Sequence, residues 1–111
     1  MATVYNLAID QGATFTTTLS LADDTGTARN LSTYTARGQM GRSYYSTSNV
    51  QFTISIDNPA EGEVVISLSA DKTANLKYGR YVYDVELVSN TLTIERIIEG
   101  IVTVFPEVTK A

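Results

Sequence analysis

The chain has 111 residues, a formal net charge of −4 at pH 7, and neither cysteine nor histidine. Its length suits one domain with a single core, and 43% hydrophobic with 18% charged residues is a globular composition. The missing residue types exclude disulfides, thiol or imidazole catalysis and the usual zinc ligands, and the acidic balance argues against nucleic acid as a partner. We therefore expect one domain over residues 1–111 that holds no cofactor and no metal.

The sequence contains no apolar run near 18 residues and no charged-then-apolar leader. We therefore expect no membrane partner, no secretion signal, and assembly in a cytoplasm. The charged fraction of 18% is below the average for a soluble domain, and Ser and Thr are frequent instead, especially between residues 14 and 48. Ser and Thr suit the pleated surface of a strand but leave few charges to keep copies apart, which a protein within a larger assembly tolerates.

The first part of the chain predicts two strands. Apolar and polar residues alternate over residues 5–9 and again over residues 15–21, and the turn-forming residues Asp10-Gln11-Gly12 separate the two runs. Asp23 and Asp24 follow the second run. We interpret them as a hairpin tip rather than a calcium loop, because calcium needs more oxygen donors at regular spacing.

A central strand is predicted next, over residues 34–40. Its inward face would carry Tyr34, Ala36, Gly38 and Met40, and small residues there let an opposite sheet approach closely. Residues 41–49 lack a hydrophobic period, which predicts an exposed loop or strand edge.

This loop and the preceding strand contain the main candidate for a partner surface. Tyr44 and Tyr45 must point to opposite sides if the chain is extended, so at least one is expected to face solvent. Tyr and Arg are enriched at interfaces, and Arg37 and Arg42 lie close by in the sequence. A plain solvated loop is the alternative interpretation.

Residues 50–56 and 64–68 alternate in the same way, and a short connection containing Pro59 and Gly62 predicts a hairpin between them. The following residues, 69–76, predict one helical turn or two. Ser69 is the expected N-cap, and Leu76 is expected to plug the gap between two sheets at the end of a sandwich.

The segment Gly79 to Phe105 predicts a long antiparallel hairpin around which the fold is organised. One face of its first strand contains four apolar residues, namely Tyr81, Tyr83, Val85 and Leu87. A turn is expected at residues 89–91 and a second strand from Leu92, ended by Pro106. The apolar residues of that strand do not stay on one face, which predicts either a bulge near Gly100 or a strand covered on both faces. In the second case an outward patch of Ile97, Ile101 and Phe105 would require a partner subunit.

Two carboxylate pairs are the remaining candidates for chemistry: Asp84 with Glu86, and Glu95 with Glu99. On strand exteriors, residues at these spacings are usually solvated or face basic residues across the sheet, here Arg80 and Arg96. We therefore expect no enzymatic activity.

About seven short strands with regularly spaced turns and no alternating helices predict an all-β sandwich. Four segments add a more specific resemblance. They read, in order, QGATFTTTLSLADDTG, LSTYTARGQM, GEVVISLSADKTANLKYGRYVYDVEL and RIIEGIVTVFPEVT. Together they cover nearly the whole chain, and it resembles the Ig-like structural module of tailed-bacteriophage virion proteins, similar to the N-terminal domain of baseplate upper proteins and to small structural proteins of cyanobacterial phages.

The resemblance implies an Ig-like antiparallel sandwich of about seven strands with one short helical turn, and a non-enzymatic role in a phage virion. The chain would be an adaptor, connector or decoration subunit of the head, neck, tail or baseplate, assembled in the host cytoplasm with other virion proteins and with further copies of itself. Because the sequence stops soon after PEVT, where baseplate proteins continue into a receptor-directed portion, we do not carry their host binding over. The alternative is a module that binds a host surface or a glycan through Tyr44 and Tyr45.

Overall fold

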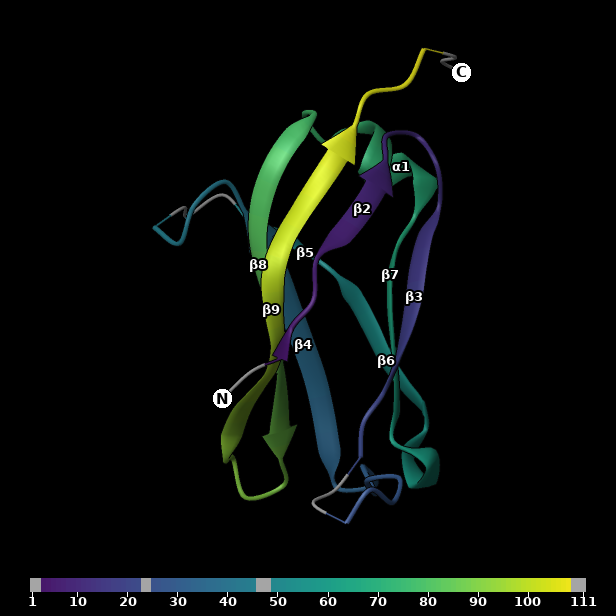
Figure 1. Ribbon diagram of the computed structural model, residues 1–111, viewed down its shortest axis with the longest axis vertical. Coiled ribbons are helices and arrows are strands. Elements are labelled where there is room, and N and C mark those ends of the chain that lie inside the picture. Colours follow the sequence, from purple (N-terminus) through teal and green to yellow (C-terminus); the bar gives the residue numbers. More distant parts are fainter. Residues whose placement is uncertain (1–2, 23–24, 46–48, 109–111) are drawn as a thin grey trace.

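The computed structural model describes residues 3–22, 25–45 and 49–108, which form a two-layer β-sandwich (Figure 1). One sheet contains β1 (Thr3–Val4), β2 (Leu7–Asp10), β4 (Tyr34–Gly41), β5 (Val50–Gln51), β8 (Gly79–Ser89) and β9 (Ile94–Phe105). The second contains β3 (Phe15–Ser20), β6 (Thr53–Asn58) and β7 (Glu63–Leu68). Two short helices complete the elements, η1 (Pro59–Glu61) and α1 (Ala70–Ala74). The predicted all-β sandwich with a short helical segment is confirmed.

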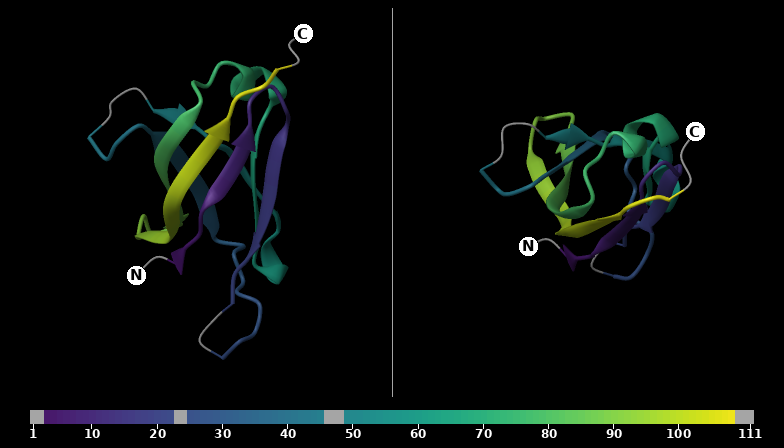
Figure 2. Two further views of the ribbon diagram at one scale, coloured as in Figure 1. Left: turned by 45° about the horizontal axis from the view of Figure 1, so that its top comes forward. Right: turned by 90° about the horizontal axis from the view of Figure 1, so that it is seen from above.

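The strand order is that of an Ig-like sandwich. Strands β4, β8 and β9 are antiparallel neighbours in one sheet, and β3, β7 and β6 are antiparallel neighbours in the other, matching the C-F-G and B-E-D orders of that fold. Strands β1 and β2 pair with β9 in parallel, and Figure 2 shows β2 beside β9 along the edge of the larger sheet. The chain passes from one sheet to the other between β5 and β6, at Phe52.

The core lies between the two sheets. The predicted inward face of β8 is confirmed, because Tyr81, Tyr83, Val85 and Leu87 are all buried. Alternate residues of β7 face them from the second sheet and are fully buried, namely Val64, Ile66 and Leu68. The Phe52 ring meets the Tyr83 ring edge to face, with 6.0 Å between centroids and 81° between planes. This arrangement lets two large rings share the space between the layers.

The small residues on the inward face of β4 are required by close packing, as predicted. A Cβ atom on Gly38 would lie 2.8 Å from the backbone oxygen of Asp84 and 3.0 Å from the Cδ1 of Ile54. These two neighbours belong to β8 in the same sheet and to β6 in the opposite one. Any side chain at this position would therefore push the strands apart.

Helix α1 closes the end of the sandwich at which β3 begins and β7 ends. Its predicted N-cap is confirmed, since the Ser69 hydroxyl accepts a hydrogen bond from the Lys72 backbone N–H at 3.4 Å. The buried Thr73 hydroxyl donates to the Ala13 carbonyl at 2.8 Å, which ties the helix to the turn before β3. Leu76 is buried in the core cluster, as expected of a plug between the sheets.

Strand β9 contains a bulge, but its position differs from the prediction. Val85 pairs with Ile98 and the next residue, Glu86, pairs with Arg96, so Ile97 is the extra residue. Because of this bulge both isoleucines turn inward, with Ile97 8% and Ile98 4% exposed. The prediction that Ile97 belongs to an outward patch is therefore wrong.

Gly100 does not form the predicted bulge but leaves space for the N-terminal segment. A Cβ atom there would lie 2.6 Å from the carbonyl oxygen of Tyr5, which belongs to the short segment between β1 and β2. That segment is held by two further contacts, one with β9 and one with β8. The Asn6 side-chain oxygen accepts a hydrogen bond from the Ile101 N–H at 3.0 Å, and the Tyr83 hydroxyl donates to the Tyr5 carbonyl. Gly100 thus permits the N-terminal chain to cross close to β9.

Two boundaries also differ from the sequence interpretation. The last strand begins at Ile94, because Leu92 lies in the preceding turn with φ of 65° and its N–H donates to the Ser89 carbonyl at 3.0 Å. Of the first predicted strand, residues 5–9, only residues 7–9 lie in a strand, β2, because Tyr5 and Asn6 form the link from β1. The predicted hairpin tip at Asp23 and Asp24 lies outside the described residues.

Candidate binding surfaces

The outward face of the larger sheet contains a group of ion pairs. The Arg37 Nε donates to Glu86 at 2.9 Å across β4 and β8, and Arg96 lies 3.4 Å from Asp84 and 3.6 Å from Glu99. The expected pairing of Arg96 with a carboxylate is confirmed, whereas Glu86 pairs with Arg37 rather than Arg80. Both members of the first candidate acid–base pair, Asp84 and Glu86, therefore face arginines.

Partial burial of Asp84 has an electrostatic consequence. Desolvation raises the pKa of the Asp84 carboxyl above its ordinary value, and the nearby Arg96 only partly offsets this. Arg96 lies closest to one carboxylate oxygen of Asp84, Oδ2. Asp84 is thus a half-buried hydrogen-bond acceptor whose charged form is disfavoured.

Glu95 of the second candidate pair lies away from Glu99, near the start of β9. Arg29 donates to both of its carboxylate oxygens, at 2.7 and 3.0 Å, and also to the Tyr34 hydroxyl at 3.3 Å. These hydrogen bonds lower the pKa of the Glu95 carboxyl. The guanidinium also lies 5.1 Å from the centroid of the Tyr34 ring. Arg29 therefore covers the core at this end, which the sequence pattern did not indicate.

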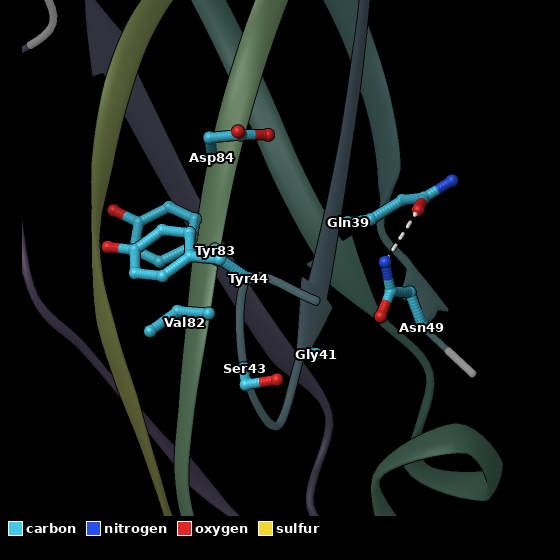
Figure 3. Close-up of a pocket in the computed structure, with 8 residues that line it drawn as sticks. All are labelled: Gln39, Gly41, Ser43, Tyr44, Asn49, Val82, Tyr83 and Asp84. Carbon is cyan, nitrogen blue, oxygen red and sulfur yellow. Dashed lines mark hydrogen bonds between the residues drawn. The ribbon is translucent and has the colours of Figure 1, made fainter. Parts of the chain in front are cut away.

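The loop between β4 and β5 borders a small polar depression, which we call the polar hollow (Figure 3). It has a volume of about 100 Å³ and is lined by Gln39, Gly41, Ser43, Tyr44, Asn49, Val82, Tyr83 and Asp84. On one side of it the side-chain N–H of Asn49 donates to the Gln39 oxygen at 3.3 Å, as the dashed line in Figure 3 shows. A second depression, the adjoining hollow, shares Gln39 and Asp84 with it. That depression has a volume of about 210 Å³ and is also lined by Arg37, Gly38, Gln51 and Glu86.

The structure separates the four residues that the sequence grouped near this loop. Tyr44 lines the polar hollow and is 78% exposed, whereas Tyr45 is 94% exposed and lines neither depression. Arg37 is paired with Glu86 in the adjoining hollow. Arg42 instead lies over the Tyr81 ring, 4.4 Å from its centroid. Arg42 therefore covers the core instead of joining the tyrosines in a common patch.

Exposed apolar side chains lie on the outward face of β9 and its parallel neighbour, with Thr103 between the two on β9. Ile101 is 40% and Phe105 49% exposed, in agreement with their predicted outward position. Val4 of β1 pairs with Glu99 in the register that places it on the same face, and it is also exposed. We call these three residues the apolar row. The sequence interpretation missed Val4, because a two-residue strand has no period to detect.

Within the described ranges, no group of three or more acidic side chains lies close enough together to hold a metal ion. Likewise, none of the described helices is long and apolar enough to cross a membrane.

Comparison with known proteins adds no family to this geometry. No protein-family model matches the chain, and a search of curated proteins finds no match either.

Proposed function

We propose that this protein is a non-enzymatic structural subunit of a bacteriophage virion, acting as an adaptor, connector or decoration protein of the head, neck, tail or baseplate. Its partners would be other virion proteins, including further copies of itself, and it would assemble in the host bacterial cytoplasm. The single observation that carries the proposal is the apolar row on a rigid sheet face. The segment order described above supplies the phage context.

The apolar row has the properties of the centre of a protein interface. Ile101 and Phe105 project from β9, which is hydrogen-bonded on both sides, by β8 and by β2, so their positions are fixed before a partner arrives. Burying such side chains against a partner releases water from apolar surface, at about 25 cal/mol for each Å² removed. No ordering of a loop opposes that gain.

The charged residues beside the row supply the polar rim that interfaces usually have. Asp84 and Glu99 form the pair next to Val82 and Ile101 on the same sheet face, and Arg96 forms ion pairs with both acids. Mixed charges at a rim contribute orientation and selectivity more than affinity. An apolar centre with such a rim is typical of a surface that another protein covers.

Interface variants test the proposal. Ile101→Asp and Phe105→Asp place a charge in the apolar row, and we expect each to reduce self-association and incorporation into particles. Leu92→Asp is the matched control, because Leu92 is also exposed but lies in a turn with positive φ, where Asp is well tolerated. The measurements are sedimentation velocity of the purified protein and mass spectrometry of purified virions. A wild-type protein that is monomeric at all concentrations and absent from particles would refute the proposal.

A further inference from the structure

The polar hollow and the adjoining hollow are lined by hydrogen-bonding groups that the described part of the chain leaves unused. The oxygen of Gln39 accepts from Asn49, but its own NH₂ group has no partner there, and the same holds for both ends of the Gln51 amide. Asp84 uses Oδ2 toward Arg96, which leaves Oδ1 as a free acceptor. The groups that face the two depressions therefore include both donors and acceptors on neighbouring strands.

This mixture matches a hydroxyl-rich, uncharged ligand. A hydroxyl group donates one hydrogen bond and accepts others, so it is satisfied by amides and a carboxylate placed side by side. An anion is disfavoured, since the walls contain Asp84 and Glu86 and their one nearby arginine in the adjoining hollow, Arg37, is already paired with Glu86. A metal cation is disfavoured as well, because no group of three or more acidic side chains among the described residues lies close enough together to hold one.

The ring of Tyr44 at the border of the polar hollow adds an apolar surface to these polar groups. The Tyr44 side chain is largely exposed, and Figure 3 places it on the side of Val82, across the depression from Gln39 and Asn49. Aromatic rings offer a flat apolar surface beside a polar group. A pyranose ring has the complementary form, with an apolar C–H face and a rim of hydroxyl groups.

We propose that the two hollows form a glycan-binding site that holds two consecutive pyranose units of a saccharide chain. One unit occupies the polar hollow, stacks on Tyr44 and hydrogen-bonds to Gln39, Asn49 and Asp84. The next unit lies in the adjoining hollow against Gln51. Because both depressions are open to solvent and share Gln39 and Asp84, the saccharide continues beyond them in either direction. This inference goes beyond the proposed virion role and does not rest on it. The glycan site lies on β4, β5, β8 and the loop between β4 and β5, and the apolar row lies on β1 and β9, although Asp84 borders both surfaces.

The pair of adjacent tyrosines provides the first test. The probes are methyl glycosides of glucose, galactose, mannose and N-acetylglucosamine, titrated into ¹⁵N-labelled protein at millimolar concentration. We expect saturable amide shifts for at least one probe, clustered at Gln39, Tyr44, Asn49 and Asp84. Tyr44→Ala should weaken binding by about tenfold, the factor expected for loss of a stacking contact. Tyr45→Ala should leave the affinity unchanged.

The second test uses the corresponding disaccharides and asks whether two units are recognised. We expect a disaccharide of the bound sugar to bind more tightly than the monosaccharide, and Gln51→Ala to weaken only the disaccharide. Unchanged amide spectra away from each substitution would show that the variants fold. Absence of saturable shifts with every probe, equal loss in Tyr44→Ala and Tyr45→Ala, or equal affinity for one and two units would each overturn the proposal. Shifts with inorganic sulfate but with no glycoside would do the same.

Discussion

The guanidinium of Arg42 lies over the ring of Tyr81 and donates hydrogen bonds to two backbone carbonyls near the start of β8. The bonds reach the oxygens of Tyr78 at 3.1 Å and Arg80 at 3.3 Å. Arg42 thereby joins the end of β4 to the start of β8 and covers the edge of the core. Only a planar cation with several N–H groups can stack and bridge two acceptors at once.

We therefore expect both Arg42→Ala and Arg42→Lys to destabilise the fold. The cost should be about 1 kcal/mol, because one exposed cation–π contact and two partly solvated hydrogen bonds are lost or weakened. Urea unfolding followed by circular dichroism measures this difference. Arg80→Ala is the control, because Arg80 is exposed on β8 and the substitution keeps the backbone carbonyl that accepts from Arg42. A fully stable Arg42→Lys variant would show that charge alone is sufficient.

The ion pair between Arg29 and Glu95 predicts a specific acid sensitivity. The pKa of Glu95 is lower in the folded chain than its ordinary value, so the unfolded chain binds the proton more readily in the acidic range. This contribution to stability is complete above the ordinary pKa of a glutamate and is lost as the pH falls through the folded value. Glu95→Gln should therefore flatten the decrease in unfolding free energy between neutral and strongly acidic pH.

Asp84 should show the opposite sign, and it serves as the internal control. Its pKa is raised in the fold, so the folded chain binds the proton more readily, and stability decreases as the pH rises through that range. Asp84→Asn should remove this opposing contribution and make the net acid sensitivity steeper. Identical pH profiles for the two variants would contradict both assignments.

The contact between Gly100 and Tyr5 predicts that Gly100→Ala loosens the N-terminal strands. The added methyl group would meet a backbone oxygen, which cannot rotate away as a side chain can. We expect a cost of about 1–3 kcal/mol, together with faster hydrogen exchange of the β2 amides bonded to β9. The control is Gly26→Ala, where nothing lies within 4 Å of the added atom and only the backbone conformation, with φ of 83°, is strained.

The bulge predicts opposite behaviour for two isoleucines four residues apart on β9. Ile97→Ala should destabilise the monomer by about 2–4 kcal/mol, because it empties part of the core. Ile101→Ala should change the unfolding free energy by well under half of that amount, since the side chain is already partly solvated. Thermal unfolding at low protein concentration distinguishes the two variants. Similar losses of stability would indicate that Ile97 and Ile101 lie on the same face, as they would in a strand without the bulge.

Patterns with a period of two allowed most strands to be predicted. Tyr81 to Leu87 and Val64 to Leu68 alternate without interruption, so their inward faces followed directly. The N-cap at Ser69 and the plug at Leu76 were also predictable, because both depend on local chain chemistry. These elements are specified by residues that are close together in the sequence.

Features that depend on distant contacts were not predictable in the same way. The two isoleucines at 97 and 98 show that the pattern shifts, but the residue that is extra depends on the pairing with β8. Gly100 is needed because of Tyr5, which lies 95 positions earlier. The placement of Arg42 over Tyr81 separates it from Tyr44, although the sequence brings the two within three residues. In each case the residue that makes the decisive contact is distant in the sequence and is brought close only by folding.

The parallel pairing of β2 with β9 has a mechanical consequence. In this register Leu7 lies beside Val102 and Asp10 beside Phe105, so the N-terminal strand starts at one end of the ladder and the C-terminal strand leaves at the other. Tension applied between the two chain ends would pull these strands along their length and load all of their hydrogen bonds together. The same bonds would open one after another if the strands were peeled apart. The seam between the first and last strands is thus oriented to resist stretching along the long axis of the molecule.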